Sequence, residues 1–324
     1  ASAQQPVTQI APHLAALYEK AKPEGEVSIW GPGAASLEWI PAEFAKRFPG
    51  IKVTWFGDQQ ASSRLIAESH AGRHAADTWT FSLGGTLEVQ KRGLLQKTDW
   101  RTLGAQDRDI FFDGEAVGIY NVVYVPVFAR NRLARDAVPA QWTGMVDPVW
   151  DNKLVSGTFL LPRLGGYLAI EWGFGETERW IRTLMDQRKM LVTTAPVSGF
   201  LASGERQLAV AETSGGAFMM RRDGLDVGHR VMDIVPASQF VYAVTRKAPH
   251  PNAARLLCGW LITPEAKRLY EKVAGQIDIR SNPDAPLSQE IKEAGAKVIY
   301  EDLESMGQRA DYYRRLMSVV RGQG

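Results

Sequence analysis

The sequence predicts an α/β protein whose sheet is mainly parallel. Residues 27 to 85 contain three strand–turn–helix units in succession, and a second series of such units begins at residue 157. Strands that alternate with helices in this way favour right-handed crossovers and parallel pairing. The chain has 324 residues, a length that suggests two domains rather than one.

The first series is defined by short apolar runs and by the residues that end each helix. Residues 27–30 form an apolar run, and the pattern that follows its glycine-rich turn, 31–36, places apolar side chains on one helix face. Glycine and proline residues then mark the helix ends. The predicted strands are 27–30, 51–55 and 77–81, and the helices after them end near Pro49, Gly72 and Gly93.

The remaining elements are predicted from the same signals. An amphipathic helix covers residues 10–22, and the β-rich segment 118–127 is long enough to run from one lobe into another. The second series has strands at 157–163 and 208–212, a helix at 176–188, and two further strands at 231–236 and 240–245. Asn252 is predicted to cap a helix, and Pro264 to open the next.

Serines follow each of the first three predicted strands. In an open parallel sheet these turns meet at the carboxyl edge, where ligands bind. Each turn also begins a helix, whose free N–H groups favour anions. Ser36, Ser62, Ser63 and Ser82 are therefore candidate ligand contacts. The alternative is that each serine only caps its helix, because serine is a preferred N-cap residue.

The second series supplies the strongest candidate for a ligand's charge partner. Arg163 is predicted to end a strand just before a turn at Gly165 and Gly166. Its guanidinium can bind a carboxylate or a phosphate through two parallel hydrogen bonds. An equally open interpretation is a surface arginine that pairs with a nearby acid.

Further candidates lie at other predicted strand ends. Thr213 and Ser214 occupy the turn after the strand at 208–212, and Gln239 precedes the strand that returns to the first lobe. Tyr120 could form an apolar wall of the site, although aromatic residues in strands are more often core. Arg64 faces either the cleft or solvent.

Composition excludes several classes of protein. The formal net charge is +2, which is no footprint for nucleic acid or for an anionic membrane surface. Cys258 is the single cysteine and lies in an apolar helical pattern, so it is predicted to be a buried core thiol. No apolar run is long enough to span a bilayer. Ala1–Ala3 is similar to a signal-peptide cleavage site, which would make the chain an exported one, and a cloning remnant is the alternative.

No motif indicates a metal, a cofactor or catalysis. His70 and His74 have the spacing of two ligands on a helix face, but Gly72 intervenes, and both are predicted to lie at the surface. Residues 31–36 nearly match a dinucleotide fingerprint, with Asp58 further on. Ser36 replaces the third small residue of that fingerprint, so a dinucleotide-dependent enzyme is kept as an alternative.

Several stretches together resemble the periplasmic substrate-binding proteins of ABC importers, in the type-II class and nearest to its ferric-iron or family-1 branch. The match runs through almost the whole chain in the family's order. Its stretches are Glu24–Trp30, Phe44–Val53, Ala71–Asp77, Leu201–Glu205, Ala248–Ala254 and Trp260–Glu265.

The resemblance implies two α/β lobes joined by crossing strands, with a ligand clamped between them by hinge closure. It implies a periplasmic protein that delivers its solute to a membrane permease and performs no catalysis. We expect a monomer without a cofactor. The expected lobes are residues 1–120 with 242–285, and residues 121–241 with 286–324.

The chain departs from the ferric-binding pattern at one place. Such proteins carry adjacent tyrosines just after the strand that here reads Leu208–Glu212, whereas this chain continues with Ser214–Arg222. Thioether and phenyl groups cannot replace phenolates as ligands of Fe(III). The sequence therefore favours a small anionic solute of the carboxylate, phosphonate or phosphate type. Ferric iron held by other ligands is the alternative.

Overall fold

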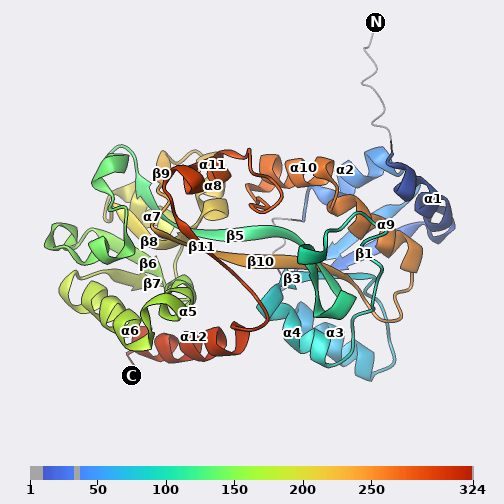
Figure 1. Ribbon diagram of the computed structural model, residues 1–324, viewed down its shortest axis with the longest axis horizontal. Coiled ribbons are helices and arrows are strands. Elements are labelled where there is room, and N and C mark those ends of the chain that lie inside the picture. The colour runs from blue at the N-terminus through green and yellow to red at the C-terminus, as the bar shows by residue number, and fades with distance from the viewer. Residues whose placement is uncertain (1–9, 33–36, 323–324) are drawn as a thin grey trace, which may run out of the picture. The chain divides into compact units, whose positions relative to one another are not determined.

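A computed structural model describes residues 10–32 and 37–322, and it divides the chain into two compact units. Unit 1 comprises Ala1–Tyr120 and Gln239–Ala274, and unit 2 comprises Asn121–Ser238 and Gly275–Gly324. Two long strands carry the chain from one unit into the other (Figure 1). They are β5 (Ala116–Ala129) and β10 (Ile234–Val244).

In unit 1, the three predicted strand–helix units are confirmed. The parallel strands lie in the order β2-β1-β3, and the second half of β10 pairs with β3 in the antiparallel sense. A helix follows each parallel strand, as right-handed crossovers require. The strands are β1 (Glu26–Trp30), β2 (Lys52–Phe56) and β3 (Thr78–Ser82), and the helices are α2 (Ile40–Arg47), α3 (Ala61–His70) and α4 (Leu83–Lys91).

Three more helices complete unit 1 around an aromatic core. Helix α1 (Pro12–Ala21) packs on α9 (Pro251–Leu261), which α10 (Pro264–Ala274) follows (Figure 1). The Trp39 ring contacts both Trp260 and Tyr270. Cys258 is fully buried, and burial raises the pKa of its thiol, so the prediction of a core cysteine is confirmed.

Unit 2 repeats the same construction. Its parallel strands lie in the order β7-β6-β8, and β5 lies antiparallel to β8, with Tyr124 opposite Thr213. The short β9 (Val227–His229) pairs with β5, and β11 (Lys297–Tyr300) runs parallel to β10. The parallel strands are β6 (Leu154–Gly157), β7 (Leu191–Thr193) and β8 (Leu208–Thr213).

Strands and helices together form two apolar cores in unit 2. One core includes Trp142, Leu168 and Leu316, and the other includes Val125 and Leu287. Helix α12 packs on α5 (Figure 1). The helices are α5 (Leu160–Trp172), α6 (Phe174–Arg182), α7 (Val197–Ser203), α8 (Ser214–Arg222), α11 (Pro286–Glu293) and α12 (Met306–Val320).

Several predicted element bounds were wrong. The strand predicted at 157–163 ends at Gly157, because Leu161, Leu164 and Leu168 have helical spacing and are buried on one face of α5. Proline is tolerated in a first helical turn, so Pro162 does not prevent that helix. The strands predicted at 231–236 and 240–245 form one continuous strand, β10. The helix predicted at 176–188 ends at Arg182 and continues as a π-helical turn, Thr183–Gln187.

Candidate functional site

The carboxyl edge of the unit 1 sheet begins at Trp30, Phe56 and Ser82, where β1, β2 and β3 end. Just after β1, the backbone at Gly31 passes very close to the backbone of β3. A Cβ at that position would lie 1.8 Å from the carbonyl oxygen of Thr80, so only glycine fits. Backbone packing therefore accounts for the first glycine of the near-fingerprint without a dinucleotide.

Arg64 supplies a positive charge at this edge. Its guanidinium carbon lies 5.2 Å from the centre of the Trp30 ring and 4.6 Å from that of Phe56, so the cation is held against two aromatic faces. The Arg64 Nε donates a hydrogen bond to the Glu68 carboxylate at 3.2 Å. The side chain remains 52% exposed. A ligand at this edge can therefore reach the guanidinium.

The predicted serines of unit 1 fall into different positions. Ser82 is the N-cap of α4, and its Oγ accepts a hydrogen bond from the Gly85 N–H at 3.1 Å, so the capping interpretation holds for this residue. Ser62 and Ser63 lie within the first turn of α3, whose N-cap is Gln60. Ser36 lies outside the described residues.

The carboxyl edge of the unit 2 sheet is formed by the ends of β6, β7 and β8. Thr213 caps α8 there, because its Oγ1 accepts from the Gly216 N–H at 3.0 Å, and Ser214 is the first helical residue. Before them lies Glu212, a buried carboxylate that accepts from the Thr213 N–H at 2.8 Å. Burial raises the pKa of Glu212, although the hydrogen bonds from Thr213 oppose that rise.

Arg163 lies at the same edge, in the first turns of α5 rather than at a strand end. The side chain is exposed, and no carboxylate of the described residues lies within 4 Å of its guanidinium. Burial raises the pKa of the Tyr124 phenol, and the positive charge of Arg163 nearby opposes that rise. The arginine that the sequence singled out thus has no acidic partner among the described residues, and its guanidinium carbon lies 5.8 Å from the centre of the Tyr313 ring. Its helix begins just after β6 ends.

Gly165 and Gly166 do not form the predicted turn. Both are buried inside α5, where a Cβ on Gly165 would lie 2.6 Å from Cδ1 of Leu316. A Cβ on Gly166 would lie 3.4 Å from the carbonyl oxygen of Arg309. These glycines therefore let α12 approach α5 closely, and the turn prediction was wrong because it followed from the misplaced strand.

Tyr120 and Gln239 lie in the core of unit 1. The Tyr120 ring stacks on Phe240, with ring centres 4.9 Å apart and an angle of 14° between the planes. The Gln239 side-chain amide donates to the backbone carbonyls of Tyr120, at 3.2 Å, and Phe240, at 2.9 Å. Both side chains are only 4% exposed. The hydrogen bond from Gln239 to Tyr120 joins β10 to β5, so the two residues have a structural role here.

A cluster of buried hydroxyls in unit 2 was not predicted. The Tyr167 hydroxyl lies 2.9 Å from the Ser238 Oγ, and the Tyr124 hydroxyl is hydrogen-bonded to the same serine. Burial raises the pKa of both phenols, and the negative charge of Glu301 adds to the rise for each. These residues come from β5, α5 and β10, so no spacing in the sequence brings them together. Both tyrosines are held as neutral phenols.

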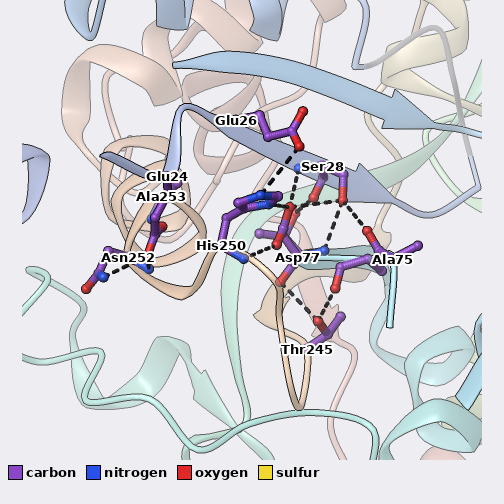
Figure 2. Close-up of polar contacts among 11 residues, drawn as sticks. Glu24, Glu26, Ser28, Ala75, Asp77, Thr245, His250, Asn252 and Ala253 are labelled. Atoms are coloured by element: carbon purple, nitrogen blue, oxygen red, sulfur yellow. Dashed lines mark hydrogen bonds and ion pairs between the residues drawn. The ribbon is translucent and has the colours of Figure 1, made fainter. Parts of the chain in front are cut away.

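Three of the stretches that carry the family resemblance meet in one polar network at the other end of the unit 1 sheet. Figure 2 shows the His250 ring between Glu26 and Asp77. Asp77, 1% exposed, accepts hydrogen bonds from the backbone N–H groups of Ser28 at 2.8 Å and His250 at 2.7 Å. Its second contact with His250 is to Nδ1, at 3.0 Å.

Glu24 extends this network to the start of α9. Its carboxylate accepts from the backbone N–H groups of Asn252 at 3.1 Å and Ala253 at 2.7 Å, and from the Asn252 amide at 2.7 Å (Figure 2). A carboxylate from another segment thus caps α9. Its negative charge is stabilised there by the positive end of the helix dipole. Asn252 is not the cap that the sequence predicted. These residues of the family resemblance thus join β1, the segment before β3 and the start of α9.

The part of the chain that the structure describes offers no metal site. It contains no group of three or more histidine, cysteine, aspartate or glutamate side chains suited to a metal ion. His70 is exposed and His74 is half-buried, as befits surface residues. Among the same residues, no helix is both long and apolar enough to cross a membrane.

Comparison with known proteins supports the fold at low sequence identity. No family model matches the chain, and no curated protein matches it. Iron-bound HitA from Pseudomonas aeruginosa superposes with a TM-score of 0.73 at 17% identity, over 92% of this chain and 99% of that one. The substrate binding protein of an ABC transporter from Agrobacterium tumefaciens gives 0.72 at 15% identity, over 91% and 94%.

A third solved structure has the same architecture. The spermidine/putrescine ABC transporter substrate-binding protein PotD from Streptococcus pneumoniae gives a TM-score of 0.68 at 14% identity, over 91% of this chain and 99% of that one. The predicted fold class, the two-lobe type-II fold of periplasmic substrate-binding proteins, is thereby confirmed. The Agrobacterium tumefaciens and Streptococcus pneumoniae neighbours are substrate-binding proteins of ABC transporters.

Proposed function

We propose that this chain is the solute-binding component of an ABC importer and that its solute is a small anion of the carboxylate, phosphonate or phosphate type. The observation that carries the anionic assignment is Arg163. Its guanidinium is exposed and has no acidic partner among the described residues. Arg163 lies in the first turns of α5, the helix that follows β6. An arginine with its charge uncompensated at a ligand-binding edge favours a carboxylate or a phosphoryl group.

The other groups at the two carboxyl edges support the same ligand class. Arg64 presents a second cation at the edge of unit 1, and α8 begins at the edge of unit 2 with Thr213 and Ser214. The acid at the latter edge, Glu212, already accepts the Thr213 N–H and is buried. Asp58 places an exposed carboxylate just after β2, so the anionic assignment rests on the two arginines and not on an absence of acids at these edges.

Ferric iron fits these residues less well. Helix α8 contains no tyrosine, and the two tyrosines of unit 2 that lie close together, Tyr124 and Tyr167, are buried phenols with raised pKa values. Fe(III) prefers phenolate oxygens, so binding here would have to remove protons that burial retains. We expect no charge-transfer absorption when Fe(III) citrate is added to the purified protein. A visible band with saturating intensity would favour the iron alternative.

Capture then follows from a difference in affinity between conformations. A ligand shifts a hinge equilibrium only by the free energy with which it prefers one state, so charge-assisted hydrogen bonds made only on closure would drive it. Four properties stay predictions of the family resemblance: the clamp between lobes, delivery to a permease, a periplasmic location and a monomeric state.

The alternative of a dinucleotide-dependent enzyme rested on the glycine-rich turn after β1. Close packing against Thr80 explains Gly31 in that turn without a dinucleotide.

The proposal is tested by a thermal-shift screen of dialysed protein against small carboxylates, phosphonates, sugar phosphates, Fe(III) citrate and NAD. A ligand at one hundred times its dissociation constant should stabilise the protein by about 2.7 kcal/mol. A shift confined to anions of one class supports the proposal. A shift with Fe(III) citrate or NAD alone contradicts it.

The first substitution to make is Arg163→Ala. We expect it to weaken binding of the anion found in the screen by about 1.5–3 kcal/mol, the usual contribution of hydrogen bonds to charged groups. Calorimetry with wild type and variant measures this. Arg314→Ala is the matched control, because that arginine is also exposed and its partner Asp311 lies on the same helix. Equal affinities for wild type and Arg163→Ala would remove Arg163 from the site.

A further inference from the structure

Unit 1 contains a cavity lined by cationic side chains, formed by residues that do not follow any of its parallel strands. The cavity has a volume of about 370 Å³ and lies among α1, α9 and the segment 98–103. Its polar lining consists of His13, Lys20, Thr98, Asp99, Thr102 and Arg255. We propose that it binds a small carboxylate that also carries a hydrogen-bond donor.

Arg255 is the centre of the argument. Its Nη2 donates to the Asn252 Oδ1 at 2.7 Å, and Asn252 is itself fixed by Glu24. The guanidinium is half-buried, its Nε has no hydrogen-bond partner, and no carboxylate of the described residues lies within 4 Å of it. A partly desolvated and unneutralised cation gains more from an added anion than an exposed one does.

A histidine and a lysine border the same space. His13 and Lys20 are separated by seven residues on α1, so they share one face of that helix two turns apart. Lys20 has no acid within 4 Å among the residues described, unlike Lys22, which pairs with Glu19 at 2.5 Å. Lys20 on α1 and Arg255 on α9 thus line the same cavity from two packed helices, and a carboxylate bound there is attracted by both charges.

Asp99 narrows the class of ligand. Its carboxylate also lines the cavity and would repel a multiply charged anion such as a phosphate dianion. It can accept a hydrogen bond from a hydroxyl or an ammonium group of a ligand. The best match is therefore a monocarboxylate with such a donor, for which glycolate and glycine are the simplest probes.

The test uses the full chain and follows the side-chain Nε–H resonance of Arg255 in ¹H–¹⁵N spectra, assigned by its loss in Arg255→Lys. Titration with glycolate or glycine should shift this resonance saturably, whereas acetate should bind at least about threefold more weakly. Lys20→Gln should raise the dissociation constant about tenfold. Because Lys20 is exposed at the end of α1, this variant is expected to fold normally. The Arg314 resonance serves as the exposed control.

The outcomes separate this site from the proposed solute site. Arg163→Ala should leave the Arg255 response unchanged, so a failed solute assignment would not affect the result. A response that stays linear to the highest concentration, or that matches Arg314, would overturn the cavity proposal. So would an unchanged dissociation constant in Lys20→Gln.

Discussion

At Asp77, one carboxylate joins three segments that are far apart in the sequence. It receives backbone N–H groups from Ser28 and His250 and faces the His250 ring, while its own carbonyl accepts the Thr245 N–H at 3.0 Å. A buried carboxylate of this kind is stable because its donors are already in place. Its removal would leave those donors without partners.

We expect Asp77→Ala to lower the free energy of unfolding by about 3 kcal/mol or more, because hydrogen bonds to a charged group contribute about 1.5–3 kcal/mol each. Urea denaturation followed by circular dichroism measures the change. Asp58→Ala is the control: Asp58 is exposed and accepts one local hydrogen bond, from the Gln60 N–H at 2.7 Å. A loss no larger than in Asp58→Ala would show that the network is dispensable.

Glu212 makes stability depend on pH at a single residue. Burial raises its pKa in the folded protein, so the folded state binds this proton more tightly than the unfolded state. Stability contributed by Glu212 is therefore greatest at low pH and falls as pH rises from the usual glutamate pKa through the raised folded value. Glu212→Gln should remove this component.

The comparison of wild type with Glu212→Gln isolates the effect from other titrating groups. The difference in free energy of unfolding between the two proteins should shift in favour of Glu212→Gln as pH increases over that window. A difference that does not change with pH would show that the Thr213 hydrogen bonds fully offset burial.

At the scale of elements, the contact of α5 with α12 depends on two consecutive glycines. Gly165→Ala places a methyl group 2.6 Å from Leu316 and 3.1 Å from Ile181 Cδ1. We expect a loss of about 1–3 kcal/mol, the usual cost of overpacking a core. Gly307 lies in α12 with open space around it, so Gly307→Ala should instead stabilise by about 0.5–1 kcal/mol. Thermal unfolding of both variants decides, and equal effects would refute close packing at Gly165.

The sequence predicted those elements whose signals agree. The units around β1, β2 and β3 were found because short apolar runs, glycine ends and helical spacing all gave the same answer. Residues 157–163 were misassigned because an apolar run with a proline fits a strand end or a first helical turn equally well. Asn252 has the composition of a cap, but Glu24 takes that role from more than two hundred residues away.

The candidate site was predictable only in part. Arg163 was selected by its chemistry and by a predicted strand end, which the structure replaces with the first turns of α5. The structure adds that no acid among the described residues neutralises it. The cluster of Tyr124, Tyr167 and Ser238 could not be predicted, since tertiary contacts bring three elements together. The predicted turn at Gly165 was wrong for a similar reason. A glycine that lets a neighbouring helix pack closely cannot be told from a turn glycine by sequence alone.

On the scale of the whole molecule, neither unit is a continuous piece of chain. Unit 1 obtains the β3 partner β10 and the helix α9 only from residues 239–274. Fragment 1–120 would lack His250, the partner of Asp77, and Asn252 and Ala253, the partners of Glu24, so we expect it to be unfolded. Joining residues 1–120 to 239–274 through a short glycine-rich linker should restore folding. Amide spectra of both fragments test this, and a dispersed spectrum for residues 1–120 alone would contradict it.

The position of the Glu24–Asp77–His250 network has a consequence for classifying sequences. Three of the six stretches that make this chain recognisable meet at the amino end of the unit 1 sheet, whereas Arg64 and Arg163 follow the carboxyl ends of parallel strands. A search profile weighted toward the first set would group proteins by architecture, whatever cargo they carry. A profile that sorts them by cargo should be weighted toward the few positions just after β1, β2, β3, β6 and β8.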